Sequence, residues 1–503
     1  MRISSIIPCV RNANGSGHEQ RRQTDGPGKD EVNRMNDFRK TAQEMLEFIR
    51  ISPTCFHAVA NIGRMLEAAG FQQLQEKEEW KLEKGGRYYT ERNDSSVIAF
   101  VIPEKEVGIR GFHMAAAHSD SPCFKIKEKP ELTVEEHYLR LNTEKYGGMI
   151  LSTWLDRPLS VAGRLAVKNG NGIEGRLVNI DRDLCVIPNV AIHMNREMNK
   201  GVEYNPQVDL LPLLADVSFD EYDAHTTYDA QTASENAEEQ PEAVEKPTLV
   251  ALAAETAGVD AETILGEDLF LYTRQEGKMI GAKGEFVLSP RLDDLQSAFA
   301  LTKAFTESTP AEYINVCAVF DNEEVGSGTR QGADSTFLED ILQRIAEGLQ
   351  ADHSSYLRWV ADSFLISADN AHAVHPNHPE KADPTNRPYL NGGIVIKYHG
   401  SQKYTTDGIS AARMKDYCER AKVPYQTYAN RSDIAGGSTL GNISTAHVSV
   451  SSVDIGLPQL AMHSAVETAG MKDTEYAVRA LKEFWGERLK VYFVFHRMKI
   501  GFP

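Results

Sequence analysis

A pair of adjacent glutamates follows an apolar run, and this arrangement constrains the fold more than any other feature of the chain. The run covers residues 314–319, and the sequence Asp321-Asn322-Glu323-Glu324 comes shortly after it. Such a run is typical of a buried strand in a mostly parallel sheet, and ligands of open α/β sheets bind at the carboxyl ends of the strands. Because neighbouring side chains of an extended chain point apart, one carboxylate could hold a metal ion while the other accepts a proton.

Taken alone, the pair could be solvated glutamates in a loop, but four other segments favour a functional site. Each segment is an apolar run followed by polar side chains that can bind a metal. The segments contribute His118, Asp293, Asp369 and His463. Mixed nitrogen and carboxylate ligands with no cysteine nearby suit zinc, with cobalt or manganese as substitutes. Two metals about 3.5–4 Å apart, bridged by a carboxylate, are the usual hydrolytic arrangement.

These five motifs, in this order, resemble those of the aspartyl aminopeptidase family, a group of dinuclear zinc exopeptidases. The motifs are His118-Ser-Asp-Ser-Pro, Pro290-Arg-Leu-Asp-Asp, Asp321-Asn-Glu-Glu-Val-Gly-Ser, Ser367-Ala-Asp-Asn-Ala-His-Ala-Val-His-Pro-Asn and Pro458-Gln-Leu-Ala-Met-His-Ser. The resemblance runs from about Met35 to the C-terminus. The first 34 residues have no counterpart, and the acidic stretch near 215–247 resembles a lineage-specific insertion.

The resemblance implies a role for each polar residue of the motifs. His118 and Asp369 would hold one of two zinc ions, Glu324 and His463 would hold the other, and Asp293 would bridge them. Two further residues would act beside the ions. Asp120 would accept the second N–H of the His118 imidazole, and Glu323 would be the general base. Asp294 would be structural, for example as a helix cap.

A lysine at the end of an apolar strand predicts the specificity. Lys397 closes the segment 391–398, and burying its ammonium costs free energy unless an anion is close. In the family, the equivalent lysine lies in the pocket for an acidic substrate side chain, and Tyr404 is near it. A preference for N-terminal Asp or Glu is therefore expected. The alternative is a lysine that reaches solvent or pairs with an aspartate of the protein.

The family resemblance also implies an assembly. Dimers, joined through an inserted domain, would gather into a tetrahedral dodecamer that encloses the active sites and admits peptides. The segment Ala191-Ile192-His193-Met194 resembles one whose histidine reaches the active site of a neighbouring subunit. His193 is thus expected to stabilise the tetrahedral oxyanion in trans. The alternative is a strand histidine at a subunit contact.

Two other segments contain residues that could bind ligands. His372, His375 and His378 recur every three residues, but Pro376 and Pro379 prevent a regular helix, so the imidazoles need not share a face. A separate metal site there is not expected. The polar segment 430–439 could line the pocket or could be a strand-to-helix turn, and its Arg431 is a candidate partner for a carboxylate.

Composition narrows the class of protein. The net charge of −18 argues against nucleic acid or an anionic membrane surface as a partner. The six cysteines are scattered, which favours free thiols in a reducing cytoplasm. No apolar run approaches the roughly 20 residues of a membrane span, and the apolar part of the N-terminus, residues 3–10, is a poor secretion signal.

The pattern of apolar residues predicts an α/β protein with a mixed sheet between helices and an inserted β-rich dimerisation domain. Residues 35–120 and 279–503 would form the catalytic metallopeptidase domain, and residues 121–278 the inserted domain. Residues 1–34 would be a disordered tail, and 215–247 a flexible acidic excursion. Seven helices are expected. One runs from Met35 to the break at residues 52–54, a second follows and ends at Gly70, and the others cover 248–266, 294–307, 335–350, 408–422 and 472–488.

Three functions remain to be separated. A metal-dependent aminopeptidase is favoured, either with the acidic preference or with broad specificity for neutral N-terminal residues. A related hydrolase, such as a deacylase, would act on other amides. A non-catalytic scaffold or cargo protein would keep the fold but not the activity, although such a protein would have no reason to retain every proposed ligand together with Glu323.

Overall fold

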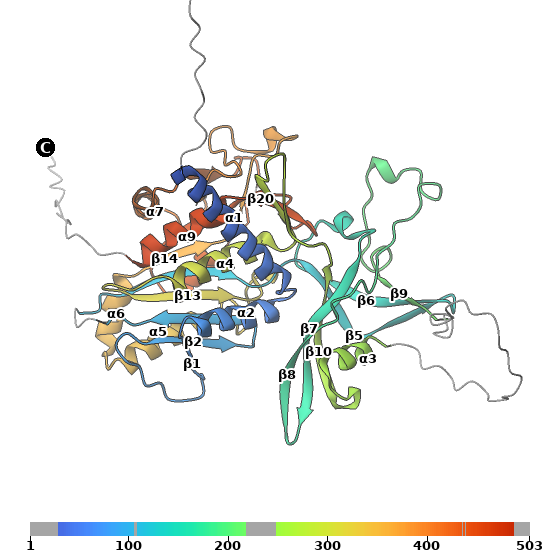
Figure 1. The fold of residues 1–503 in the computed structure, drawn as a ribbon, viewed down its shortest axis with the longest axis horizontal. Helices are drawn as coiled ribbons and strands as arrows, with labels where there is room; N and C mark the ends of the chain where they lie inside the picture. Colours follow the sequence, from blue (N-terminus) through green and yellow to red (C-terminus); the bar gives the residue numbers. More distant parts are fainter. Residues whose placement is uncertain (1–28, 105–107, 218–247, 435, 438, 487–503) are drawn as a thin grey trace, which may run out of the picture.

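The computed structural model describes residues 29–104, 108–217, 248–434, 436–437 and 439–486. Its largest element is a nine-stranded mixed sheet (Figure 1). The strands, in spatial order, are β1 (Gln72–Gln73), β2 (Arg87–Arg92), β3 (Ser96–Val101), β13 (Ile314–Phe320), β4 (Phe112–His118), β14 (Phe364–Ala368), β18 (Ser451–Gly456), β16 (Ile394–Tyr398) and β17 (Tyr425–Ala429).

The centre of this sheet is parallel. β13, β4, β14 and β18 are neighbours that run in the same direction, so their carboxyl ends meet at one edge. β13 and β4 are buried along their whole length, as expected for a parallel sheet covered on both faces. In the register of this pair, Phe320 lies opposite His118. The residues that follow these two strands are thereby brought together.

Helices cover both faces of the sheet. Ala115 and Ala117 of β4 join one apolar core, while Met114 and Ala116 join the other, because alternate side chains of a strand point to opposite faces. The first core is completed by α1 (Lys29–Arg50), α2 (Cys55–Ala68), α4 (Leu292–Thr306), α7 (Gly408–Ala421) and α9 (Asp473–Trp485). The second is completed by α5 (Phe337–Gly348), α6 (His353–Ala361) and α8 (Leu440–His447).

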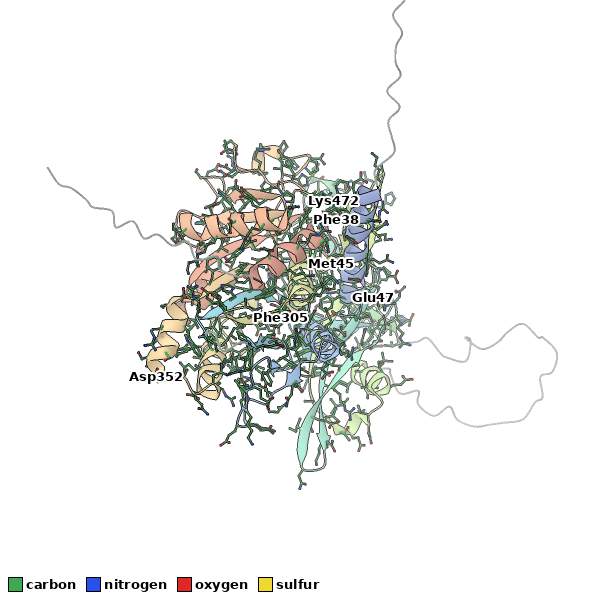
Figure 2. All side chains as sticks on the ribbon, turned by 60° about the vertical axis from the view of Figure 1, so that its left-hand side comes forward. Phe38, Met45, Glu47, Phe305, Asp352 and Lys472 are labelled. Atoms are coloured by element: carbon green, nitrogen blue, oxygen red, sulfur yellow. The ribbon has the colours of Figure 1, made fainter. Side chains whose placement is uncertain are left out.

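The N-terminal helix is part of the first core. Figure 2 labels Phe38 and Met45 on α1 and Phe305 on α4, and all three side chains are buried in this core. The ring of Phe38 packs edge-on against Tyr476 of α9, with 4.9 Å between the centroids. Helix α1 therefore ties the start of the described chain to its last helix.

A second sheet has six strands, all antiparallel to their neighbours. Its spatial order is β8 (Gly172–Asn179), β7 (Leu159–Asn169), β10 (Ile264–Thr273), β5 (Cys123–Val134), β6 (Tyr138–Tyr146) and β9 (Leu213–Asp216). We call residues 123–273 the inserted domain, because in the sequence they lie between β4 and β13, which are neighbouring strands of the nine-stranded sheet. It has its own apolar core, which includes helix α3 (Leu249–Ala257), and lies to the right in Figure 1.

A third, five-stranded sheet lies beside the edge where the parallel strands end. Its strands are β11 (Lys278–Ile280), β12 (Phe286–Ser289), β20 (Glu467–Gly470), β19 (Pro458–Leu460) and β15 (Ala371–His372). Short 3₁₀ helices complete the description. They are η1 (Leu151–Trp154), η2 (Met198–Lys200), η4 (Ala261–Thr263), η5 (Glu323–Val325) and η6 (Pro379–Lys381).

The predicted fold class, a mixed sheet between helices, is confirmed. Six of the seven predicted helices are present as α1, α2, α4, α5, α7 and α9. The remaining one, over 248–266, was predicted too long: α3 ends at Ala257, where Gly258 adopts a left-handed φ of 65°, and β10 begins at Ile264. The predicted tail was also too long, since α1 begins at Lys29. Residues 1–28 and most of the acidic excursion, 218–247, lie outside the described residues.

Two properties of the described chain bear on its surroundings. None of its helices is both long and apolar enough to cross a membrane. Its five cysteines are free, and four of them are buried.

Candidate metal centre

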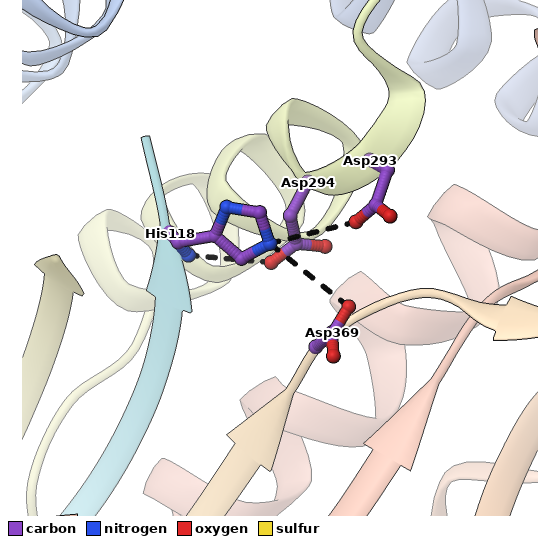
Figure 3. A group of neighbouring side chains, drawn as sticks. All are labelled: His118, Asp293, Asp294 and Asp369. Atoms are coloured by element: carbon purple, nitrogen blue, oxygen red, sulfur yellow. Dashed lines mark hydrogen bonds and ion pairs between the residues drawn. The ribbon is translucent and has the colours of Figure 1, made fainter. Parts of the chain in front are cut away.

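The ends of two central strands carry the first cluster of candidate ligands. His118 is the last residue of β4, and Asp369 follows β14 directly. Asp293, in the first turn of α4, lies beside them (Figure 3). The His118 Nε2 atom is 3.5 Å from Asp293 Oδ1 and 4.0 Å from Asp369 Oδ1. The other ring nitrogen, Nδ1, faces the backbone oxygen of Asp120 at 3.1 Å and its carboxylate at 3.4 Å. The predicted contact between Asp120 and the imidazole is thus present, mainly through the main chain.

A second cluster shares Asp293 with the first. His463 Nε2 is 3.5 Å from Asp293 Oδ2 and 3.4 Å from Glu324 Oε1. The two carboxylate oxygens of Asp293 therefore face two different imidazoles. His463 Nδ1 lies 3.0 Å from the backbone oxygen of Gly148 in the inserted domain. That contact fixes which ring nitrogen is left to face the carboxylates.

The donor atoms of both clusters fit a zinc ion. Asp293 Oδ1 and Glu324 Oε1 are buried and have no hydrogen-bond partner. Two atoms bound to one zinc at about 2.0–2.1 Å lie about 3.3 Å apart in tetrahedral geometry, which is close to the separations of 3.4 and 3.5 Å seen here. In each cluster the candidate ligand atoms lie within 4.8 Å of one another. Oxygen and imidazole donors without thiolates suit zinc.

Asp294 supports the strand that carries His118. It is fully buried, and its Oδ2 accepts a 3.3 Å hydrogen bond from the backbone N–H of His118. Asp293 and Asp294 have non-helical φ and ψ angles, so the regular part of α4 begins at Leu295 and Asp294 lies immediately before it, at the position of a helix cap. The prediction that Asp294 is structural agrees with this position and with its hydrogen bond to β4. Its carboxylate belongs to the same cluster of candidate ligands as His118 and Asp369.

The two glutamates occupy a 3₁₀ turn and not an extended strand. Asn322 has a left-handed φ of 63°, which ends β13 and starts η5. The Asp120 carboxylate holds this turn, because Oδ1 accepts from Glu323 N and Oδ2 from Glu324 N, both at 3.2 Å. Burial raises the pKa of Glu323 to about 7, although the His118 imidazole acts in the opposite direction. A carboxyl with such a pKa can exchange protons near neutral pH.

A cavity of about 350 Å³ opens onto both clusters. It is lined by Asp293, Glu323, Glu324, Asp369 and His463, together with Asn370, Ala371, His372, Lys397, Tyr404, Tyr428, Gly437, Thr439 and Met462. A second cavity, of about 470 Å³, shares His372, Tyr404, Tyr428 and Gly437 with the first. Together they offer space for a ligand beside the candidate metal ligands.

Lys397 is buried in the first cavity's wall and already has an anionic neighbour. Its Nζ lies 3.3 Å from Asp369 Oδ2, 3.1 Å from Asn370 O and 5.2 Å from the ring centre of Tyr404. Burial lowers the pKa of this ammonium, but Asp369 and Tyr404 outweigh that effect, so the pKa is raised and the lysine stays charged. The structure thus brings Lys397 and Tyr404 together, and it also shows the predicted alternative of a pair with an aspartate.

Four other residues named from the sequence lie away from the clusters. His193 is on an exposed turn of the inserted domain and does not line the cavity of the candidate ligands. Arg431 lines only the second cavity, where Asp433 pairs with it at 2.7 Å. His375 and His378 also line that second cavity, with 5.3 Å between their ring centres. Within the described part of the chain, no cluster of candidate metal ligands includes either of them.

Two residues at the centre were not predicted. Glu467 is buried, and its carboxylate accepts hydrogen bonds from His463 N at 2.7 Å and Asp293 N at 3.0 Å. Tyr146 donates a 2.8 Å hydrogen bond to Asp120 Oδ2. A carboxylate four residues after a candidate ligand is a weak signal for Glu467, whereas nothing in the sequence around Tyr146 indicates its contact.

Comparison with known sequences agrees with this geometry. A profile of the family described as "Aminopeptidase I zinc metalloprotease (M18)" matches residues 48–485. The probable M18 family aminopeptidase 2 of Clostridium novyi (strain NT) is 47% identical over 448 residues, which are 89% of this chain and 98% of that protein. The protein of the same description from Pseudomonas entomophila (strain L48) is 40% identical over 446 residues, which are 88% of this chain and 97% of that protein.

Solved structures share the fold. A chain of the Ape4 and Nbr1 complex superposes with a TM-score of 0.82 at 36% identity, covering 90% of this chain and 86% of that one. A chain of the S. cerevisiae mApe1 dodecamer superposes with a TM-score of 0.74 at 26% identity, covering 89% and 97%. The fold, the clustered ligands and these relatives lead to one conclusion: the chain belongs to the M18 family of zinc metallo-aminopeptidases.

Proposed function

We propose that this M18 aminopeptidase uses two zinc ions per subunit and preferentially removes N-terminal Asp or Glu from peptides. His118, Asp293 and Asp369 would hold one ion, and Asp293, Glu324 and His463 the other. The observation that carries the two-ion site is Asp293, whose two oxygens each lie 3.5 Å from a different imidazole. One buried carboxylate between two imidazoles is the arrangement of a bridging ligand.

Glu323 is the proposed general base. Bound zinc would polarise the scissile carbonyl and lower the pKa of water from 15.7 towards about 7. Glu323 lines the cavity and holds no proposed ion, so its carboxylate is free to take the proton of the attacking water. The same carboxyl would then donate that proton to the leaving amine.

Lys397 supports the acidic preference. It is a buried cation in the wall of the same cavity, and Tyr404 and His372 lie in that wall with it. Asp369 pairs with the Lys397 ammonium but would also bind a zinc ion, so it neutralises the ammonium only in part. A substrate carboxylate would supply the remaining negative charge. The competing function is a broad aminopeptidase for neutral residues, in which Lys397 serves only to hold Asp369.

The assembly is the third part of the proposal. We expect a homo-oligomer formed through the inserted domain, in line with the dodecamer of S. cerevisiae mApe1. Large apolar side chains flank His193 on its exposed turn: Ile192 is 46% exposed and Met194 is 82% exposed. We expect a partner subunit to cover these apolar side chains. His193 would then reach the active site of a neighbouring subunit.

One set of measurements tests the function. Zinc content should be two per subunit, chelation should abolish release of the N-terminal residue, and added zinc, cobalt or manganese should restore it. Aspartyl and glutamyl substrates should be cleaved faster than leucyl or alanyl ones. Faster cleavage of leucyl substrates would establish the broad aminopeptidase, and no cleavage of any peptide by the zinc-loaded protein would establish a scaffold.

A mixing experiment tests the action of His193 in trans. His193→Ala and Glu323→Gln subunits should each be inactive, while mixed oligomers should regain part of the activity. In a mixed oligomer some sites combine an intact Glu323 with an intact His193 from the neighbour. Mass spectrometry of differently tagged chains would show whether the subunits exchange. If they exchange and no activity is recovered, the proposal is contradicted.

A further inference from the structure

One short segment of the inserted domain reaches the metal centre. Residues 146–150 begin at the end of β6 and lead into η1. We propose that this segment positions Glu323, Glu324 and His463, and that Tyr146 is its principal positioning residue. The inference rests on the proposed two-zinc function and adds to it a part of the inserted domain on which one of the two ions depends.

The Tyr146 hydroxyl connects Asp120, which follows β4, with Asn322, which precedes η5. It donates to Asp120 Oδ2 at 2.8 Å and accepts from Asn322 Nδ2 at 2.8 Å. Asp120 in turn accepts from the backbone N–H groups of Glu323 and Glu324. Asn322 sets the left-handed bend that starts their 3₁₀ turn. Removing the hydroxyl therefore loosens the two groups that determine where both glutamates lie.

The ring of Tyr146 is anchored in the inserted domain. It packs edge-on against Phe270 of β10, with 5.7 Å between the ring centres. β6 itself is paired with β5 along most of its length. The hydroxyl thus approaches Asp120 and the 3₁₀ turn of the two glutamates from a paired strand, which suits a group that positions ligands.

The two glycines after Tyr146 place the main chain against the other ligands. Gly147 has a φ of +79°, and a Cβ at this position would lie 3.2 Å from the Cβ of Glu324. Gly148 O faces His463 Nδ1 at 3.0 Å, and Ile150 N donates to His463 O at 2.8 Å. The segment therefore contacts Glu324 and His463, the two ligands that would bind only the second ion.

The ligands of the first ion are supported differently. His118 is held by the backbone oxygen of Asp120 and by Asp294, and Asp369 is held by Lys397. All of these belong to the helix-covered sheet or its adjoining loops. Tyr146 touches none of these ligands and reaches His118 only indirectly, through the Asp120 carboxylate. The asymmetry leads to a specific expectation: a defect in the segment should weaken one zinc ion and leave the other nearly unchanged.

The test uses the Tyr146→Phe and Gly147→Ala variants of the full-length protein. Tyr138→Phe is the matched control, since Tyr138 lies at the other end of β6 with its side chain 49% exposed. Competition with a chelator gives the dissociation constant of each zinc, and steady-state kinetics give kcat and KM. We expect Tyr146→Phe to weaken one zinc by about 10–100-fold, the usual effect of removing a group that orients a ligand, and the other by less than about 3-fold. With both zincs restored, kcat should fall while KM stays within about 3-fold of the wild type.

A His463→Ala background identifies the affected ion. This variant removes a ligand of the second ion, so adding Tyr146→Phe should not further weaken the zinc that remains. Equal weakening of both ions, or unchanged affinity in Tyr146→Phe and Gly147→Ala, would overturn the inference. Failure of the wild type to bind two zinc ions would overturn the proposed function itself, and the two failures are thereby distinguished.

Discussion

The two halves of the metal centre are held in place by different parts of the molecule. In the strand half, His118 ends β4 and Asp369 follows β14, two parallel neighbours buried between helices. In the loop half, Glu324 lies on η5 and His463 follows β19. His463 has a left-handed φ of 66° and is 31% exposed. The core fixes the strand half, whereas the loop half depends on Glu467 and on residues 146–150 of the inserted domain.

This difference connects assembly with chemistry. A sheet edge between two packed faces changes little when the surface changes, because interiors are close-packed. A loop held by a second domain follows the position of that domain. If the inserted domain forms the dimer contact, association of subunits would stabilise the loop half and hardly affect the strand half.

The largest expected effect comes from Glu323, which lies on η5 in the loop half. Glu323→Gln removes the proposed base but keeps the size of the side chain and leaves all five proposed ligands in place. kcat should fall by roughly 10²–10⁴-fold, the usual contribution of a positioned proton transfer. Zinc content should remain two per subunit, as measured by elemental analysis. Near-normal kcat in the zinc-loaded variant would show that Glu323 is not the base.

Lys397→Ala tests whether the strand half also selects the substrate. Loss of one member of a buried charge pair typically costs about 2–5 kcal/mol, so kcat/KM for an aspartyl substrate should fall by that order. Leucyl and alanyl substrates should be affected much less, and the ratio of the rates is therefore the quantity to measure. Lys403→Ala is the control, because its ammonium donates to Gly436 O and lines neither cavity. An equal fall for all substrates would mean that Lys397 acts only by holding Asp369.

Glu467→Gln perturbs the loop half from the side of the third sheet. The carboxylate accepts two backbone N–H groups, from Asp293 and His463, whereas the amide can accept with only one of its two terminal atoms. Zinc affinity should fall by about 10–100-fold at the second ion, measured by chelator competition. Glu475→Gln is the control, since that carboxylate bonds Thr41 and Arg479 away from the centre. Unchanged affinity would assign Glu467 to folding alone.

The strand half could be predicted from the sequence for a simple physical reason. Apolar runs ending in a polar residue define the ends of parallel strands, and these ends must meet at one edge. The same reasoning located Glu323 and Glu324 but placed them in extended chain. It missed the left-handed bend at Asn322, which depends on contacts with Tyr146, Thr329 and Gln331.

The supports of the loop half could not be predicted, because they join distant parts of the chain. Tyr146 and Asn322 are 176 positions apart, and His463 and Gly148 are 315 apart. No periodic pattern reports such contacts. Helix α6 was missed for a related reason: Tyr356 is its only fully buried residue, so it has no apolar stripe. The end of α3 was misplaced because its apolar residues continue into β10.

The smallest expected effect concerns the stability of the protein in acid, through a buried histidine of the strand half. His113 lies on β4, five positions before His118, and is only 4% exposed between the rings of Tyr313 and Phe484, at 3.7 and 4.7 Å. Burial lowers the pKa of this imidazole from 6.5 to about 3. Between these two values the unfolded chain binds more protons than the folded one, so the free energy of unfolding decreases as the pH falls. At pH 5.5 the decrease should be about 1.4 kcal/mol relative to neutral pH.

His113→Phe cannot take up this proton and should lack that part of the acid sensitivity. The measurement is chemical unfolding of the wild type and the variant at pH 7.5 and 5.5, from which each protein's change between the two pH values is taken. The variant's change should be smaller than that of the wild type, because all other titrating groups are common to both. His353→Phe serves as the control, since this histidine is exposed on α6. If the free energy of unfolding of His113→Phe and of the wild type decreases equally between pH 7.5 and 5.5, the buried imidazole does not contribute to the acid sensitivity of the protein. That sensitivity then comes from other titrating groups.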